Sequence, residues 1–585
     1  MTSKTENFYK TEKVAWDVSK PGYVSESGNV TLAGDTVINV ELLKDTDWIW
    51  TNIPSEIGAQ YLTFDGYKPN SATKFSTPLS VRDCRHKLTS INLSNVYQKA
   101  TAPILFTEGL TKLKVYSDFL ETFYLRTQVS RDPEDVSDWH AGYLEQIILS
   151  HTPNLTTFSV SNSGRLRELY ADDFSHVTSM TGAFYGNTSL EHISPMYLDS
   201  CTSLSGTFEY CKFSEFPTTL HNTSNVKSTN SMLKGCINLT SVPLFDTQNV
   251  TDMQDMFYNC ANLTSIPLFD TQNVTNMRDM FEGCKSLITV PLFNTQNVTD
   301  MHSMFGSCTN LTSIPLFNTQ NVTDMGWMFY NCKSLTSVPL FDTKNVTDMS
   351  LMFANCDSLT TVASFDMSNV TRTALMFKLC KNLTTVPSLN IPNVTEAYSM
   401  FTGCSSLTTV PSINMPKVTK AYDMFKGCAS LTTVPSINMP NATNASSMFE
   451  GCTNLTSISE INTSKSLKDT HRMFYNCKKL TSIPEMYMYD VGTPSSYDTR
   501  DYDLIRDMFY GCTSLTDCGG FKDLRISIDL SACPLTHESA MNVINKVARP
   551  GYGTQTITFS RATFNTLSKE DIKIATDMWW EIDVA

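Results

Sequence analysis

Apolar and polar residues recur with a period of 24 residues along the middle of the chain. The repeat that begins at Leu263 reads Leu-Thr-Ser-Ile-Pro-Leu-Phe-Asp-Thr-Gln-Asn-Val-Thr-Asn-Met-Arg-Asp-Met-Phe-Glu-Gly-Cys. Its first apolar residues, Leu263, Ile266 and Phe269, surround a Thr-Ser pair and a proline. Because proline cannot donate a backbone hydrogen bond, this half predicts a very short strand that ends at Pro267.

The second half of the repeat predicts a short helix. Thr275 stands where an N-cap belongs, and Gly283 stands where a left-handed residue ends a helix. The apolar residues between them have the spacing of one helix face. They are Val274, Met277, Met280, Phe281 and Cys284.

The cysteines show how many copies there are. From Cys236 to Cys452 a cysteine stands every 24 residues, and spacings of 25 and 35 residues extend the series to Cys211 and Cys512. With one more copy upstream, the chain holds about fourteen units. One unit cannot bury its apolar face alone, whereas stacked copies can. We therefore predict an α/β solenoid with a narrow parallel sheet on one face, short helices on the other, and the cysteines buried as free thiols.

The two ends of the chain depart from the period. Residues 1–85 alternate apolar and turn-forming residues, which predicts a small β-rich N-terminal domain that caps the array or attaches it to a partner. Residues 86–180 carry degenerate repeats, residues 181–520 the regular ones, and residues 521–585 an α/β C-terminal cap. Tryptophans of the first segment are candidate attachment residues, with a place in its core as the alternative: Trp16, Trp48 and Trp50.

An insertion interrupts the regular array near residues 485–503, where eleven extra residues lie between Cys477 and Cys512. Insertions in repeat proteins often carry binding, and tyrosine is typical of contact loops. The insertion is therefore a candidate binding loop, and a plain solvated loop is the alternative. Its tyrosines are Tyr487, Tyr489, Tyr497 and Tyr502.

Composition and motifs argue against several classes of function. The formal charge is −14 and no basic run appears, so we do not expect a nucleic-acid partner. The histidines are scattered, and neither a catalytic motif nor the paired spacing of zinc ligands occurs. We expect a non-enzymatic protein without catalytic residues, metal or cofactor. Since no apolar run reaches about 18 residues, we do not expect membrane insertion.

The repeated pattern Asn-Val-Thr-Asp-Met-x-x-Met-Phe-x-x-Cys-x-x-Leu-Thr-x-Val/Ile-Pro resembles the BspA-like surface leucine-rich repeats of bacteria and mycoplasmas, over roughly residues 180–530. The resemblance implies extracellular display and adhesion, or a virion appendage. The C-terminal stretch from Leu535 looks like the closing segment of such arrays in phage and prophage proteins. Surface members usually carry a signal peptide or an anchor, and neither is recognisable here.

These resemblances favour a phage virion protein, a tail fibre or other appendage that is made in the host cytoplasm and carried on the particle. Its N-terminal domain would contact other virion or surface proteins. Its solenoid would recognise a host-surface protein or glycan. The alternative is a bacterial cell-surface or secreted adhesin with the same repeats.

Overall fold

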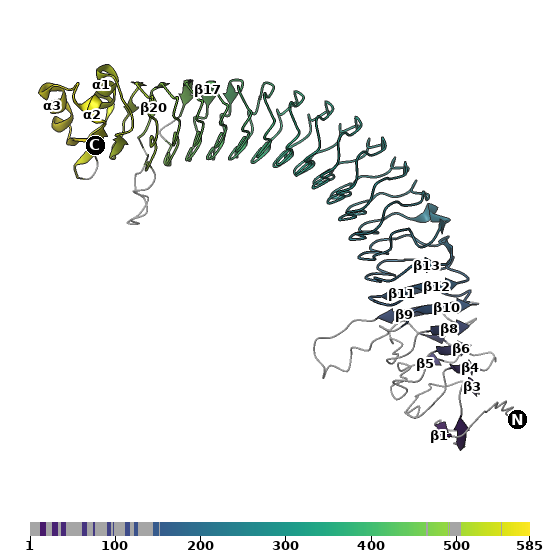
Figure 1. Ribbon diagram of the computed structural model, residues 1–585. Helices are drawn as coiled ribbons and strands as arrows, with labels where there is room; N and C mark the ends of the chain where they lie inside the picture. The colour runs from purple at the N-terminus through teal and green to yellow at the C-terminus, as the bar shows by residue number, and fades with distance from the viewer. Residues whose placement is uncertain are drawn as a thin grey trace. The chain divides into compact units, whose positions relative to one another are not determined.

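The computed structural model describes most of the chain with side chains and the N-terminal segment mainly through its strands (Figure 1). The residues described with side chains are Phe123 and residues 144–150, 152–463, 466–489, 491, 505–550 and 553–585. The chain forms two compact units, residues 1–276 and 277–585. None of the described helices is long and apolar enough to cross a membrane.

The first unit is built around a parallel sheet of seven strands, preceded by the antiparallel pair β1 (Glu12–Val18) and β2 (Glu26–Leu32). In sheet order the seven strands are β13 (His192–Ile193), β12 (Glu168–Ala171), β10 (Gln146–Ser150), β8 (Lys112–Tyr116), β6 (Ser90–Ser94), β4 (Tyr61–Gly66) and β3 (Val37–Leu42). Because β3 and β4 pair in parallel with the strands that follow, this sheet begins inside the segment predicted as a β-rich N-terminal domain.

Three shorter parallel pairs and one short 3-10 helix complete the first unit. The pairs are β5 (Lys74–Phe75) with β7 (Tyr97–Gln98), β9 (Thr122–Arg126) with β11 (Thr157–Ser161), and β14 (Met196–Tyr197) with β15 (Leu220–His221). The 3-10 helix is η1 (Thr223–Asn225).

The second unit contains a five-stranded parallel sheet and an α/β segment at the C-terminus. In sheet order the five strands are β16 (Ile413–Asn414), β17 (Thr433–Asn438), β18 (Ser457–Asn462), β19 (Ser482–Ile483) and β21 (Asp517–Cys518). A short parallel pair is formed by β20 (Met486–Tyr487) and β22 (Phe521–Lys522).

The C-terminal segment confirms the predicted α/β cap. Its parallel strands are β23 (Ile528–Leu530), β24 (Gln555–Phe559) and β25 (Trp580–Val584), and its helices are α1 (His537–Lys546), α2 (Arg561–Phe564) and α3 (Lys569–Asp577). The Thr536 hydroxyl accepts a hydrogen bond from the Ser539 N–H at 3.2 Å and so caps α1. Trp580 is buried, and its indole N–H donates to the Ala548 carbonyl at 2.9 Å.

The regular repeats stack as coils of a solenoid, which confirms the 24-residue period. In the second unit isolated parallel bridges join neighbouring coils, as between Asp300 and Asp324 and between Asp324 and Asp348. Inside the coils, the rings of Phe305 and Phe329 stack with centroids 5.8 Å apart and planes 2° apart. Repeated stacks of this kind bury the apolar face of each coil against the next.

The prediction of a helix in each repeat is wrong, because the described repeats form tight turns there. The amides of Asp279 and Phe281 donate to carbonyls of the next coil, whereas that of Met280 donates three residues back. Asp279 and Gly283 adopt left-handed φ values of 55° and 76°. The left-handed conformation predicted for Gly283 is therefore correct, but it ends a turn. A helix is about 10 Å wide, about twice a strand spacing, so inter-coil hydrogen bonds between closely stacked coils favour the narrower turns.

Candidate binding face

The cysteines, methionines and phenylalanines of the repeats form the interior. The described cysteines are free and buried, as predicted. The Cys308 thiol donates to the Phe281 carbonyl at 3.1 Å. Burial raises the pKa of the Cys452 thiol to about 12, so this thiol stays protonated at neutral pH. These positions hold the scaffold together and offer no reactive group to a partner.

Rows of constant polar residues also serve the scaffold. The Asn345 side-chain amide donates to the Gln320 carbonyl at 2.7 Å, and the Thr347 hydroxyl donates to the Thr323 carbonyl at 3.2 Å. The same contacts recur along the array. Because these side chains bond to the backbone of the preceding coil, their recurrence follows from the stacking itself.

The turn segment of the repeat carries positions whose chemistry changes strongly from coil to coil. They are the bridge residue and the second, third, sixth and seventh residues after it, between the constant Met, Met-Phe and Cys. We call these positions in the second unit, from Arg278 to Tyr422, the variable face. In four consecutive coils they are Asp300, His302, Ser303, Gly306 and Ser307; Asp324, Gly326, Trp327, Tyr330 and Asn331; Asp348, Ser350, Leu351, Ala354 and Asn355; and Arg372, Ala374, Leu375, Lys378 and Leu379.

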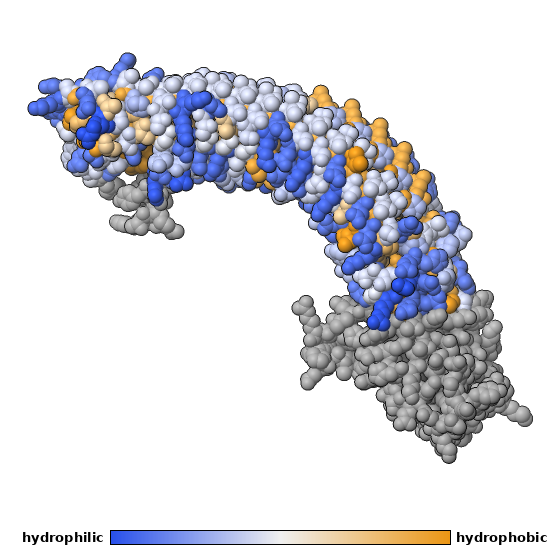
Figure 2. All heavy atoms as spheres, in the orientation of Figure 1, coloured by the Kyte–Doolittle hydropathy of each residue, from blue (hydrophilic) through white to orange (hydrophobic). Residues whose placement is uncertain are grey.

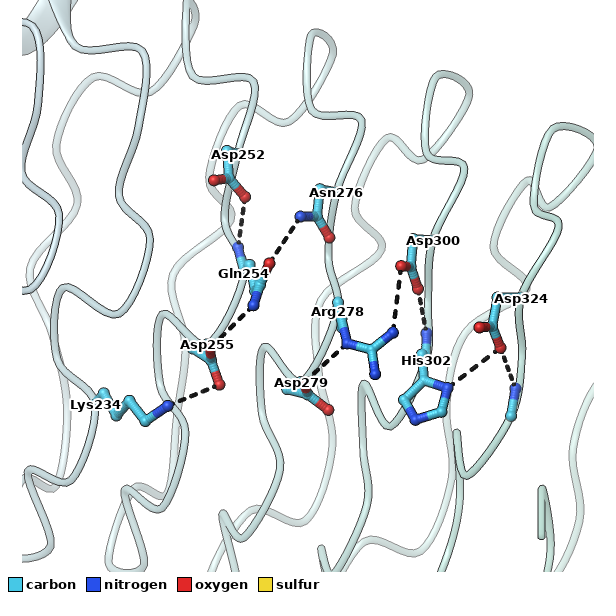
Figure 3. A network of polar contacts seen from close by, with 11 residues as sticks. Lys234, Asp252, Gln254, Asp255, Asn276, Arg278, Asp279, Asp300, His302 and Asp324 are labelled. Carbon is cyan, nitrogen blue, oxygen red and sulfur yellow. Dashed lines mark hydrogen bonds and ion pairs between the residues drawn. The ribbon is translucent and has the colours of Figure 1, made fainter. Parts of the chain in front are cut away.

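One part of the variable face is a chain of charged contacts (Figure 3). Arg278 lies 3.3 Å from the Asp279 carboxylate and 3.7 Å from that of Asp300. In the next coils His302 Nδ1 lies 3.3 Å from Asp324 Oδ1. The hydrogen bond to Asp324 raises the pKa of His302. Burial alone would raise the pKa of Asp324, but hydrogen bonds from His302 and the Gly326 N–H lower it overall.

The first unit carries its own polar contacts at equivalent positions (Figure 3). Lys234 Nζ lies 3.3 Å from Asp255 Oδ1. The Gln254 side-chain amide donates to Asp255 at 3.2 Å and accepts from Asn276 at 3.1 Å. Side chains that contact one another across coils in this way form a continuous polar surface.

The next part of the variable face is apolar and aromatic. Trp327 and Tyr330 pack with ring centroids 4.7 Å apart. Trp327, Leu351 and Leu375 occupy one position in three consecutive coils, joined by backbone hydrogen bonds, and each is partly exposed. In the next two coils, Tyr398 and Tyr422 stack with ring centroids 4.8 Å apart. A charged pair follows on that side too, Glu396 with Lys420 at 2.7 Å, and beyond the end of the variable face Lys426 pairs with Glu450 at 3.2 Å.

The backbone at this apolar row is left-handed. The φ values of Trp327, Leu351 and Leu375 are 61°, 54° and 63°. Neighbouring coils place residues there that accept this conformation more easily or are small: Asp279, Ser303, Ser399, Asp423 and Ser447. A left-handed φ costs a bulky L-residue about 1–2 kcal/mol. Strain that the scaffold does not need is typical of functional sites, so these side chains are the strongest candidates for contact with a partner.

The tyrosines predicted from the insertion lie partly within the described residues. Lys522 Nζ donates to the Tyr487 hydroxyl at 2.8 Å and lies 4.7 Å from the ring centroid. The Arg525 guanidinium lies 4.3 Å from the centre of the Tyr489 ring. Both tyrosines therefore contact cations of the segment after the insertion, and their predicted role in binding stays a prediction. Outside the described residues, or without a described side chain, are Tyr497, Tyr502, Trp16, Trp48 and Trp50.

The variable face was not among the sites predicted from the sequence. The signal was available as a change of residue type at fixed positions between copies of an otherwise uniform repeat. It was overlooked because a helix would have placed these positions on a solvent-exposed face without special meaning. Among the described residues, no group of three or more His, Cys, Asp or Glu is placed to hold a metal ion.

A family model described as "Mycoplasma protein of unknown function, DUF285" matches the repeats. Its successive matches cover residues 155–266, 261–360, 336–436, 386–487 and 434–523, which together exceed half of the chain. The chain belongs to this family. This match agrees with the resemblance of the repeats to BspA-like repeats of bacteria and mycoplasmas. It gives no support to a phage protein. A search of curated proteins gave no match.

Solved leucine-rich repeat proteins of bacteria are similar at low identity. A leucine-rich cell surface protein from Faecalibacterium prausnitzii is 19% identical over 59% of this chain and 88% of its own, with a TM-score of 0.29. A leucine-rich repeat protein from Bacteroides ovatus is 14% identical over 93% of this chain and 99% of its own, with a TM-score of 0.25. One from Eubacterium ventriosum is 15% identical over 71% and 95%, with a TM-score of 0.28.

Proposed function

We propose that this DUF285 protein is a non-enzymatic binding protein that recognises a protein ligand through its variable face. The observation that carries the proposal is the row of Trp327, Leu351 and Leu375, which hold large apolar side chains in a left-handed backbone. Protein interfaces have an apolar, aromatic centre with tryptophan and tyrosine anchors and a polar rim. The variable face resembles this arrangement: charged pairs lie before and after the apolar row along the array, and the Asp348–Arg372 pair at 3.2 Å runs beside it.

We further propose display at a bacterial surface or in secreted form, as an adhesin. This location follows from the BspA-like pattern, which extends over most of the repeats. A virion appendage rests on the shorter C-terminal stretch from Leu535. Mass spectrometry of peptides released by protease from intact cells, beside that of purified virions, separates the two. Peptides from the virion alone would overturn surface display.

Replacement of the apolar row tests the binding face. In the triple variant Trp327→Ser, Leu351→Ser and Leu375→Ser, each position receives the residue found in equivalent coils. Leu268→Ser is the matched control, because Leu268 is 61% exposed and lies outside the face. The purified chain and both variants are applied to arrays of cell-surface and matrix proteins and to a glycan array.

We expect the parent chain and the control to bind the same proteins and the triple variant to lose at least tenfold in affinity for them. Anchors of this kind each contribute a factor of ten or more when they are truncated. Equal binding by the triple variant would overturn the assignment of the face. Binding to glycans alone would overturn the protein ligand.

A further inference from the structure

A second surface feature lies on another part of the repeat and is not used by the variable face. In five consecutive repeats the residue after the proline is a leucine, and its side chain is exposed to solvent. The exposed fractions are 65% for Leu244 and 61% for Leu268 in the first unit, and 60%, 61% and 60% for Leu292, Leu316 and Leu340 in the second. We call the last three the leucine row. Strongly hydrophobic side chains stand out along the edge of the coils in Figure 2.

The fold does not require leucine at this position. In the first unit the Phe269 N–H donates to the Pro267 carbonyl at 3.0 Å, which places Leu268 at the tip of a tight turn. In the second unit the Phe365 N–H donates to the Ala363 carbonyl at 3.1 Å, and the tip is a serine. Later coils keep a polar residue there: Ser364, Ser388, Ser412, Ser436, Glu460 and Glu485. Exposed leucines that the scaffold can replace by serine are candidates for an interface.

The coils of Leu292 and Leu316 are uncharged around these leucines, whereas that of Leu340 carries Asp342 and Lys344, which pair with each other at 3.3 Å. Residues 286–299 and 310–323 contain no Asp, Glu, Lys, Arg or His, although the whole chain carries a formal charge of −14. Two copies of such an acidic chain repel one another over most of their surfaces. Repulsion is weakest where charge is absent, and Ile288, 54% exposed, adds to the apolar surface there. The charges beside Leu340 are paired with each other within their own coil, so this row offers a charged partner little complementary charge.

The spacing of the row also matches a second copy of the chain. The leucines recur once per coil, so a partner that fills the row over several coils must present apolar side chains at the same interval. Another solenoid of this repeat does so. A two-fold axis across the row would set each leucine against leucines of the other copy, which is the self-complementary arrangement of most homodimers.

We propose that the leucine row is the contact through which two copies of this protein form a homodimer. Burial of apolar side chains drives the association. Each leucine exposes roughly 100 Å² of apolar surface, so the three leucines and Ile288 of two copies give about 800 Å². This area lies below the roughly 1,200 Å² at which specific, stable interfaces begin, so the dimer is weak and reversible and forms only at high protein concentration.

Sedimentation velocity of the full chain under reducing conditions tests the proposal, from about 1 to about 100 µM. The test variant is Leu292→Ser, Leu316→Ser and Leu340→Ser, which copies the residue of later coils. The matched control is Leu351→Ser and Leu375→Ser on the variable face. Leu316→Glu is a second test, because Glu460 and Glu485 occupy the same place naturally.

We expect the parent chain and the control to dimerise with rising concentration. The test variant should stay monomeric, with at least a tenfold higher Kd and an unchanged circular dichroism spectrum. If the test variant loses its fold, Leu316→Glu decides by the same measurement. The proposal is overturned if the parent chain is monomeric throughout, if the folded leucine-row variants dimerise like the parent, or if the control loses the dimer. Ligand binding is measured separately on the arrays. A result that overturns the dimer therefore does not decide the proposed function.

Discussion

Replacement of Leu351 by asparagine separates a contact residue from a scaffold residue. Leu351 has a left-handed φ of 54°, and Asn331 and Asn355 adopt φ values of 59° and 62° in the same solenoid. The substitution relieves about 1–2 kcal/mol of backbone strain, because asparagine accepts this conformation more readily. It also loses about 1–2 kcal/mol of apolar burial from a partly exposed leucine. We therefore expect the free energy of unfolding to change by no more than about 1 kcal/mol.

The neighbouring residue provides the control. Met352 is fully buried, and Met352→Ala should destabilise the chain by about 2–5 kcal/mol through the cavity it leaves. Urea denaturation followed by circular dichroism gives the midpoints. Hydrogen–deuterium exchange of this coil shows whether unfolding begins locally, as repeat arrays allow. A loss of more than about 2 kcal/mol in Leu351→Asn, comparable to that of Met352→Ala, would show that Leu351 belongs to the scaffold and would refute its selection for binding.

Three further outcomes are expected. The pKa of His302 is raised, so its ion pair with Asp324 stabilises the fold fully below the pKa of the unfolded histidine. This contribution is lost as the pH rises through the pKa of the folded state. A nuclear magnetic resonance titration should show a lower pKa for His302 in Asp324→Asn, and an unchanged pKa would contradict the pairing. Because burial raises the pKa of the Cys452 thiol to about 12, this residue should resist iodoacetamide in native protein at pH 8 and react only after denaturation. Rapid native labelling of the Cys452 peptide, measured by mass spectrometry after proteolysis, would contradict its burial. Thr536→Ala removes the N-cap of α1 and should lower the free energy of unfolding by about 1 kcal/mol, as measured by thermal denaturation. Thr566→Ala is the control, because it makes the same substitution outside that cap.

Much of the fold follows from local sequence pattern. The spacing of cysteine, Met-Phe and Asn-Val-Thr predicts stacked coils with a constant period, because only stacking buries these apolar residues. The left-handed residue at Gly283 follows from the chemistry of glycine. The helix predicted from Val274 to Cys284 failed because apolar spacing alone does not distinguish a helix from successive turns whose amides bond to the next coil.

The candidate binding face depended on the tertiary structure more than the fold did. The sequence by itself determined which residues are buried and where the array is interrupted, since both follow from a repeated pattern of apolar residues. Only the stacking of coils brought Trp327, Leu351 and Leu375 into one row, because residues 24 positions apart become neighbours through hydrogen bonds between coils. The left-handed backbone recurs at this position in the neighbouring coils, and among the described coils these three place a large apolar side chain on it. In this turn, successive backbone amides donate hydrogen bonds alternately to the next coil and within their own coil. The conformational preference of a single residue does not predict this pattern.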